Sequence, residues 1–150
     1  VEVDAWERTQ VGSVIVTAVP ASHGAREVGY VLREDSLTVY VAGDTRFDED
    51  QFRSIAQAFP SIDAALLPVG GIRIFGRRLD MGPEEAARAA AILKPRRVIP
   101  YHYGLTGPFP FVLAPATPAK TFVEALRQGE AAATGQAVVL QPGESWHHYR

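Results

Sequence analysis

The stretch Val39-Tyr-Val-Ala-Gly-Asp-Thr45 decides how this chain is organised. Its first four residues are apolar and lead directly to Gly43, which predicts a buried strand that ends in a tight turn. Asp44 is therefore expected just beyond the carboxyl end of a core strand. A carboxylate in that position either accepts backbone hydrogen bonds in the turn or serves as a metal ligand or catalytic acid/base.

Two histidines occupy matching positions in the chain. His23 follows the predicted strand 14–20 within three residues, and His102 comes directly after the predicted strand 97–101. Imidazole and carboxylate groups are the ligands that zinc-type ions prefer. Two histidines and an aspartate at three strand ends therefore predict a metal site made by His23, Asp44 and His102.

Six short pieces of the sequence, taken in order, resemble one known family. They are His23-Gly24, Gly29-Tyr30, Ala42-Gly-Asp-Thr45, Leu67-Pro68, Met81-Gly-Pro-Glu-Glu-Ala86 and Ile99-Pro-Tyr-His-Tyr-Gly104. Together they resemble the C-terminal half of a metallo-β-lactamase-fold hydrolase, most closely the branch typified by L-ascorbate-6-phosphate lactonase. The resemblance runs from about Val14 to about Trp146.

The resemblance implies a fold, a cofactor and a reaction. The fold would be half of an αββα sandwich, and the cofactor would be two divalent metals, with zinc expected first and manganese as the alternative. His23 would bind one metal and His102 the other, while Asp44 would bridge them and take part in catalysis. A metal-bound hydroxide would hydrolyse a lactone or a phosphoester of a small-molecule substrate.

One family motif is missing from this chain. The family's first motif, His-x-His-x-Asp-His, supplies most of the other ligands, and none of the four histidines here forms it. The chain alone is therefore expected to hold little or no metal and to lack measurable activity. Together with the absence of an initiator methionine, this favours a piece of a longer protein or one chain of a split protein.

The order of elements predicts an α/β fold in a single domain, residues 1–150. Strand 62–69, helix 83–93 and strand 96–101 form a βαβ unit with parallel strands, which places Val69 and His102 at the same end of the sheet. A mixed sheet covered by helices on one face follows. The other expected elements are strands 2–9, 13–20, 28–33, 37–42, 137–140 and 145–149, a helix capped by Asp48, and a helix from Thr117-Pro118 to Gly129.

The segment 72–79 is interpreted as a loop that carries two adjacent arginines, Arg77 and Arg78. These arginines either form a solvated basic turn or line the substrate site, where they could hold a phosphate or carboxylate. Tyr103 is a further candidate for substrate binding, and Thr45 or Tyr103 could orient a ligand through a hydrogen bond. The proline-rich segment 104–118 could cover the site or pack under the next helix.

Composition narrows the range of partners. The net charge of −2 argues against a nucleic-acid partner, and the sequence lacks both an apolar run of membrane-spanning length and a signal peptide. The absence of cysteine excludes disulfides and thiolate sites and is compatible with a cytoplasmic setting. The sheet face opposite the helices would be apolar and exposed, so pairing with a complementary N-terminal half or with a second copy is expected.

Two other functions remain open at this point. The chain could be a metal-free, degenerate module that acts as a binding or structural subunit. It could also be an α/β domain that binds a phosphorylated metabolite at Gly70-Gly71 and Arg77-Arg78. The first alternative requires no partner or upstream segment with His-x-His-x-Asp-His, and the second predicts anion binding without metal.

Overall fold

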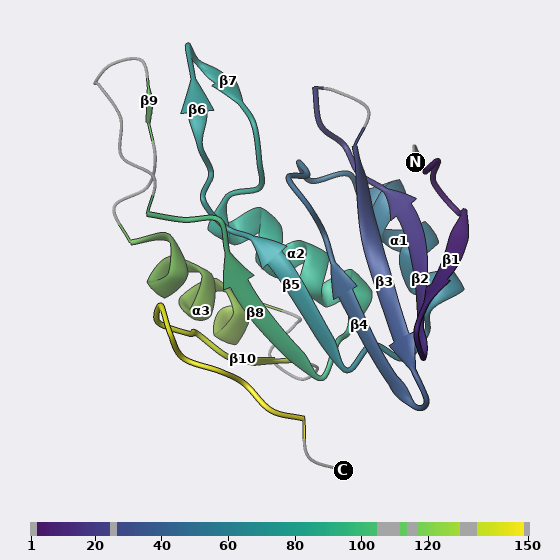
Figure 1. Ribbon diagram of the computed structural model, residues 1–150. Coiled ribbons are helices and arrows are strands. Elements are labelled where there is room, and N and C mark those ends of the chain that lie inside the picture. The colour runs from purple at the N-terminus through teal and green to yellow at the C-terminus, as the bar shows by residue number, and fades with distance from the viewer. Residues whose placement is uncertain (1–2, 25–26, 105–111, 114–116, 130–134, 149–150) are drawn as a thin grey trace.

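The computed structural model describes residues 3–24, 27–104, 112–113, 117–129 and 135–148. They form an α/β fold in which a seven-stranded mixed sheet, ordered β1-β2-β3-β4-β5-β8-β10, carries three helices on one face (Figure 1). The expected fold class is confirmed.

One half of the sheet is antiparallel. Its strands are β1 (Arg8–Val11), β2 (Val14–Pro20), β3 (Val28–Glu34) and β4 (Leu37–Val41). The predicted strand 2–9 is wrong over residues 3–7, which lie outside the sheet, whereas residues 8 and 9 belong to β1. Trp6 has a φ of 74° there, and its backbone N–H donates to Ala18 O at 2.7 Å. The Ala18 N–H donates in turn to Glu7 O at 2.8 Å, so residues 6 and 7 still contact β2, and the positive φ of Trp6 interrupts the regular pairing.

The other half of the sheet is parallel. Strands β4, β5 (Ala64–Pro68), β8 (Arg97–Tyr101) and β10 (Gln136–Ala137) pair side by side in one direction. Helix α2 (Pro83–Leu93) connects β5 to β8, so the predicted βαβ unit is confirmed. Parallel strands bring their carboxyl ends to one edge of the sheet, which is where ligands bind in such folds.

The helices begin and end where the sequence indicates. In α1 (Glu49–Ala58) the Asp48 side chain accepts from the Gln51 N–H at 3.1 Å, as expected for a cap. Helix α2 has proline at its first position, and α3 (Pro118–Gln128) ends at Gly129. Their buried residues pack on the sheet to form the core: Phe52, Ile55, Ala86, Ala89, Ala90, Leu93, Phe122 and Leu126.

The two faces of the sheet differ sharply. A row of paired residues faces the helices and is buried: Val31, Tyr40, Ala65 and Val98. The next row faces the opposite way and is only half-buried or exposed: Tyr30, Val41, Leu66 and Ile99. We call this second surface the open face. It is apolar, and none of the three helices covers it (Figure 1).

Two local predictions fail. The segment 72–79 is a hairpin of β6 (Arg73–Ile74) and β7 (Arg77–Arg78), and β6 also pairs with β9 (Val112–Leu113). Phe75 and Gly76 supply the positive φ values, 49° and 77°, that such a tight turn requires. Residues 145–148 form no strand, because their largely exposed side chains present no apolar face for a sheet.

Of the predicted strand 137–140, only Ala137 lies in a strand, which is β10 (Gln136–Ala137). Most of the predicted loop 104–118 lies outside the described residues.

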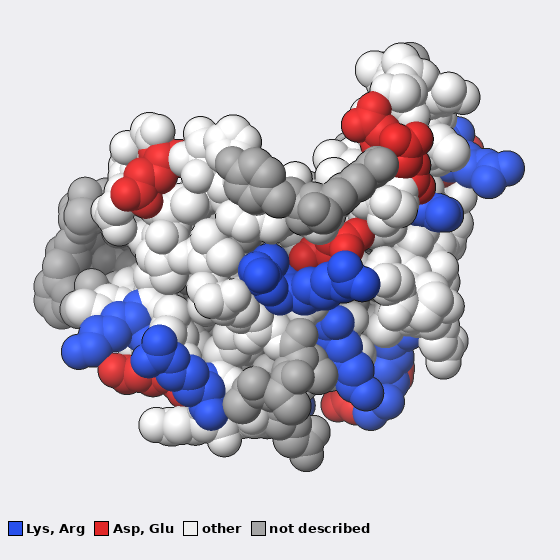
Figure 2. Space-filling model, turned by 90° about the horizontal axis from the view of Figure 1, so that it is seen from below, with Lys and Arg blue, Asp and Glu red and all other residues white. Residues whose placement is uncertain are grey.

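None of the helices in the described part of the chain combines the length and apolar composition that crossing a bilayer requires. Viewed from below, at the end of the sheet where the β3–β4 turn lies, basic and acidic side chains lie next to one another (Figure 2). That face therefore lacks the single-sign charge that would attract a polyanion.

Candidate functional site

The three predicted ligands lie beyond strand ends that point the same way. His23 follows β2, Asp44 follows β4 and His102 follows β8, and the arrowheads of these strands point to the upper end of the molecule (Figure 1). The topology therefore gathers them at one edge of the sheet, as the sequence predicted. His102 lies beside Asp44, whereas His23 is linked to the Asp44 turn through Glu27.

His102 lies between two carboxylates. Its Nδ1 is 3.0 Å from Asp80 Oδ2 and 3.5 Å from Asp44 Oδ1. The His102 and Asp44 side chains are 37% and 43% exposed, whereas the Asp80 side chain is fully buried. Burial raises the pKa of the Asp80 carboxyl group above its ordinary value, an effect partly offset by the hydrogen bond from the Ile72 N–H.

The backbone around His102 is unusual in two ways. His102 has a φ of 59°, the left-handed conformation that few non-glycine residues adopt. Gly70 packs so closely that an added Cβ would lie 2.2 Å from His102 O and 2.8 Å from Asp80 Oδ2. Only glycine fits there, so Gly70 allows the β5 and β8 ends to approach each other.

A second carboxylate connects His23 to the Asp44 turn. Glu27 Oε2 lies 2.9 Å from His23 Nδ1, and Glu27 Oε1 accepts a hydrogen bond from the Asp44 N–H at 3.0 Å. Both side chains of the His23–Glu27 pair are partly exposed, at 22% and 29%. Glu27 therefore fixes the two loops relative to each other with one carboxyl group.

The Asp44 turn is also held from the opposite side. The Tyr101 hydroxyl donates to Gly43 O at 2.5 Å, and Gly43 has a φ of 69°. Burial raises the pKa of the Tyr101 hydroxyl above its ordinary value, so it remains a hydrogen-bond donor at neutral pH.

Thr45 joins the loop that follows β2 to the start of α1. Its buried hydroxyl accepts from the Ser22 N–H at 2.8 Å and from Gln51 Nε2 at 3.2 Å, and it donates to Arg46 O. Thr45 thus holds together the loops that carry His23 and Asp44. Tyr103 is half-buried and packs against the hydrophobic core, so its predicted contact with substrate stays a prediction.

The two adjacent arginines have different partners. Arg78 forms an ion pair with Glu85 in the first turn of α2. Arg77 is exposed and lines a cleft of about 420 Å³ beside His23. Arg46, which the sequence did not single out, lines the same cleft, together with Gly24, Ile74, Phe75, Arg78 and Leu79.

The Gly70-Gly71 turn does not resemble a phosphate cradle. The Gly71 N–H donates to Met81 O at 2.9 Å, and the Ile72 N–H donates to Asp80 Oδ1 at 2.6 Å. Both amides are thus engaged, and a bound anion would face the Asp80 carboxylate. This geometry argues against a phosphorylated metabolite at the turn.

The donor set has the right chemistry for a metal but is incomplete. Among the described residues, no three or more histidine, aspartate or glutamate side chains are arranged so that they could hold an ion. His102 and Asp44 are neighbours, whereas His23 is linked to Asp44 through Glu27. The chain supplies the types of ligand that a metal requires, but not a complete cage in its described part.

The sequence alone did not reveal four residues of the site: Glu27, Asp80, Tyr101 and Arg46. Tyr101 lies inside a piece that was recognised and the other three lie next to one or within a few residues of it, yet none has a spacing that signals its role. Their importance comes from contacts across the sheet edge between residues distant in the chain.

A family model described as the beta-lactamase superfamily domain matches residues 1–103, a span that includes all three predicted ligands. The chain belongs to the beta-lactamase superfamily. Its curated relatives include the UPF0173 metal-dependent hydrolase of Pyrococcus furiosus, which is 37% identical over 145 residues, 91% of this chain and 56% of that protein. The corresponding protein of Methanopyrus kandleri is 35% identical over 150 residues, 97% of this chain and 58% of that protein. This superfamily chain spans about half the length of the curated relatives it matches.

Solved structures share the fold of this superfamily member. Igni18, a metallo hydrolase from Ignicoccus hospitalis, matches with a TM-score of 0.75 at 24% identity, over 100% of this chain and 61% of that one. CmlA, a diiron beta-hydroxylase from Streptomyces venezuelae, matches with a TM-score of 0.72 at 20% identity, over 93% of this chain and 33% of that one. These likenesses establish the fold alone, and the two names differ in reaction, so the fold does not fix the chemistry.

Proposed function

We propose that this chain is the C-terminal half of a metal-dependent hydrolase and contributes His23, Asp44 and His102 to a site for two divalent metals. The observation that carries the proposal is the placement of these three side chains at one sheet edge, with Glu27 and Asp80 against the imidazoles. Relatives named metal-dependent hydrolases support the reaction class.

The residues of the chain have distinct roles in this proposal. His23 and His102 would each help to hold one metal, and Asp44 would supply a carboxylate ligand between them. Zinc fits this nitrogen and oxygen donor set best, and manganese is the alternative. When bound, the metals would lower the pKa of a shared water to about 7 and so provide a hydroxide nucleophile.

The cleft beside His23 supports the class of substrate that we propose. Arg46 and Arg77 line it and place positive charge next to the proposed metal site, which suits a substrate with a phosphate or carboxylate. Arg78 is paired with Glu85 and therefore has less charge to offer. Tyr103 is a further residue that would contact this small-molecule substrate. A lactone or phosphoester with an anionic group is the class we propose, in keeping with the lactonase-like branch.

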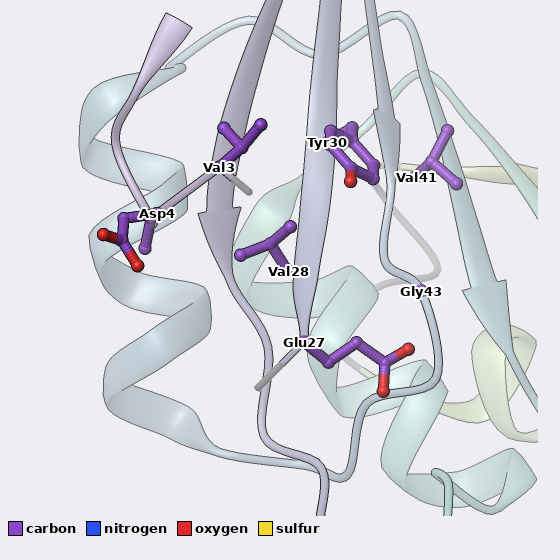
Figure 3. Close-up of a pocket in the computed structure, with 8 residues that line it drawn as sticks. Val3, Asp4, Glu27, Val28, Tyr30, Val41 and Gly43 are labelled. Atoms are coloured by element: carbon purple, nitrogen blue, oxygen red, sulfur yellow. The ribbon is translucent and has the colours of Figure 1, made fainter. Parts of the chain in front are cut away.

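The remaining ligands would come from a part of the protein outside this chain. The open face supports this assignment, because Tyr30 and Val41 project from the side of the sheet that lacks helices (Figure 3). A hollow of about 650 Å³ adjoins these residues, and Glu27 and Gly43 line it next to the proposed site. We propose that a complementary N-terminal half, or a second copy of the chain, covers this face.

Metal content is the first test. The purified protein that carries this chain, with its intact mass verified, should contain about two metals per complete site by elemental analysis. Asp44→Asn should lower both metal content and hydrolysis of lactone and phosphoester substrates, the hydrolysis by about 100-fold or more. Asp50→Asn, on the exposed first turn of α1, is the matched control and should change neither.

Two results would contradict the proposal. Unchanged metal content and activity in Asp44→Asn would remove Asp44 from the site. A complete, folded protein without metal, even after incubation with zinc or manganese, would favour the metal-free binding module instead.

A further inference from the structure

Asp80 is a buried carboxylate that reasoning from the sequence overlooked. Its side chain is fully buried at the junction of the β6–β7 hairpin and α2, and its two oxygens have separate partners. Oδ1 accepts the Ile72 N–H at 2.6 Å, and Oδ2 lies 3.0 Å from His102 Nδ1. One oxygen therefore fixes the carboxylate to the backbone while the other faces the imidazole.

The surroundings hold this pair in one arrangement. Gly70 packs against both Asp80 Oδ2 and His102 O, and the left-handed backbone of His102 sets the direction of its side chain. Two independent features, a glycine that no other residue can replace and an unfavourable backbone conformation, thus converge on the same contact. A left-handed non-glycine residue costs about 1 kcal/mol or more, so the surrounding structure must favour it.

The charges around His102 Nδ1 favour a proton on that nitrogen. Two carboxylates face it, Asp80 at 3.0 Å and Asp44 at 3.5 Å. An ionised carboxylate only accepts hydrogen bonds, so the imidazole nitrogen opposite it must be the donor. A neutral imidazole with its proton on Nδ1 keeps a lone pair on Nε2.

We propose that Asp80 is a positioning residue that holds His102 in the Nδ1–H tautomer and thereby presents Nε2 as the metal-binding atom. The metal-binding half of this statement rests on the proposed function, whereas the tautomer does not. Carboxylates that orient a ligand histidine in this way raise its affinity for metal.

The isosteric substitution Asp80→Asn tests the proposal directly. The Ile72 N–H requires an acceptor, so the amide oxygen should stay on Ile72 and the amide NH₂ should face His102 Nδ1. An NH₂ group in that position requires a lone pair on Nδ1, which moves the imidazole proton to Nε2. The variant should therefore carry the wrong tautomer with little change in shape.

The measurement is nitrogen-15 NMR of the imidazoles in the metal-free form of the protein that carries this chain. Alkaline buffer keeps the imidazoles neutral, and loss of the signal in His102→Asn assigns it, since asparagine tolerates the left-handed backbone. The expected result is Nδ1–H in the unsubstituted protein and Nε2–H in Asp80→Asn. Zinc affinity, measured by competition with a chelator, should fall about 10- to 100-fold.

Asp63→Asn is the matched control. Asp63 is also a buried aspartate that accepts a backbone hydrogen bond, from the Thr38 N–H at 2.9 Å, but it lies at the opposite end of β5. This substitution should leave the His102 tautomer and the zinc affinity unchanged. A purely structural effect of losing a buried carboxylate would therefore appear in both variants.

The outcomes separate this proposal from the proposed function. A proton on Nε2 of His102 in the unsubstituted protein, or an unchanged tautomer in folded Asp80→Asn, would overturn the role of Asp80. The first of these results does not depend on the Asp80 variant, so poor folding of Asp80→Asn leaves the proposal open to refutation. A protein that shows the expected tautomers but binds no zinc would retain the positioning role and refute the hydrolase instead.

Discussion

His102 and His23 lie at the same edge of the sheet, and each has a carboxylate against its Nδ1, yet the two pairs differ in their surroundings. The distances are nearly equal, 3.0 Å to Asp80 and 2.9 Å to Glu27. Asp80 is fully buried and bonded to backbone, whereas Glu27 is 29% exposed. Equal distances therefore do not imply equal energies, because solvent screens the Glu27 pair and a buried group loses more when its partner is removed.

Substitutions at the glycines beside the two histidines should show the largest difference in the free energy of unfolding. Gly70→Ala places a Cβ 2.2 Å from His102 O, so the backbone must move and the free energy of unfolding should fall by about 3 kcal/mol or more. Gly24→Ala, next to His23, meets no heavy atom of the described residues within 4 Å and should change it by less than about 0.5 kcal/mol. Urea unfolding measures both, and equal losses would contradict the difference between the two pairs.

Removing the carboxylates should give the next largest difference. Asp80→Ala leaves the Ile72 N–H buried without its acceptor and should lower the free energy of unfolding by about 2–3 kcal/mol. Glu27→Ala removes a partly exposed group and should lower it by less than about 1 kcal/mol. Thermal and urea unfolding would test this order, and a larger loss in Glu27→Ala would reverse our interpretation of the two sites.

Tyr101→Phe should have an intermediate effect. The substitution removes the hydrogen bond to Gly43 O and should cost about 1 kcal/mol. Because the turn that follows Gly43 carries Asp44, zinc affinity should fall as well. Tyr30→Phe on the open face is the control: Tyr30 is 39% exposed, and the substitution should change stability by less than about 0.5 kcal/mol. Similar effects of the two substitutions would show that the Tyr101 hydroxyl does not hold the turn.

Substitutions of the two hairpin arginines should have the smallest effects on stability, and only one of them should affect the binding of substrate. Arg78→Gln breaks the half-buried ion pair with Glu85 and should cost at most about 1 kcal/mol. Arg77→Gln should leave stability unchanged but raise KM for anionic substrates, since Arg77 lines the cleft beside His23. Steady-state kinetics of both variants would decide the point; a KM effect in Arg78→Gln alone would exchange the two roles.

The sequence predicted the gathering of the three ligands because topology determines it. Once 62–69, 83–93 and 96–101 are recognised as a βαβ unit, Val69 and His102 must lie at one edge. The parallel pairing of β4 with β5 brings Asp44 to the same edge. The helices could be predicted because their caps and apolar faces are local properties of the chain. These features depend on residues close in sequence or on a handedness rule that few proteins violate.

The partners of the histidines could not be predicted in this way. Asp80 lies three residues before α2, where an acidic residue usually indicates a favourable helix start, and nothing local signals that it is buried. Arg77 and Arg78 are adjacent and identical in type, but only Arg78 lies within reach of Glu85. The strand predicted at 2–9 failed over residues 3–7 because alternation of side chains does not reveal the positive φ of Trp6, which interrupts the pairing with β2.

The two hydrogen bonds that hold the Asp44 turn link its position to both halves of the sheet. Glu27, next to β3, holds the Asp44 N–H, and Tyr101, at the end of β8, holds Gly43 O. The first of these hydrogen bonds thus comes from the antiparallel half of the sheet and the second from the parallel half. Any change in sheet twist between the halves would displace Asp44 relative to both histidines at once. The shape of the open face and the positions of His23, Asp44 and His102 are therefore coupled. A partner bound to the open face would therefore alter the spacing of Asp44 from the two histidines.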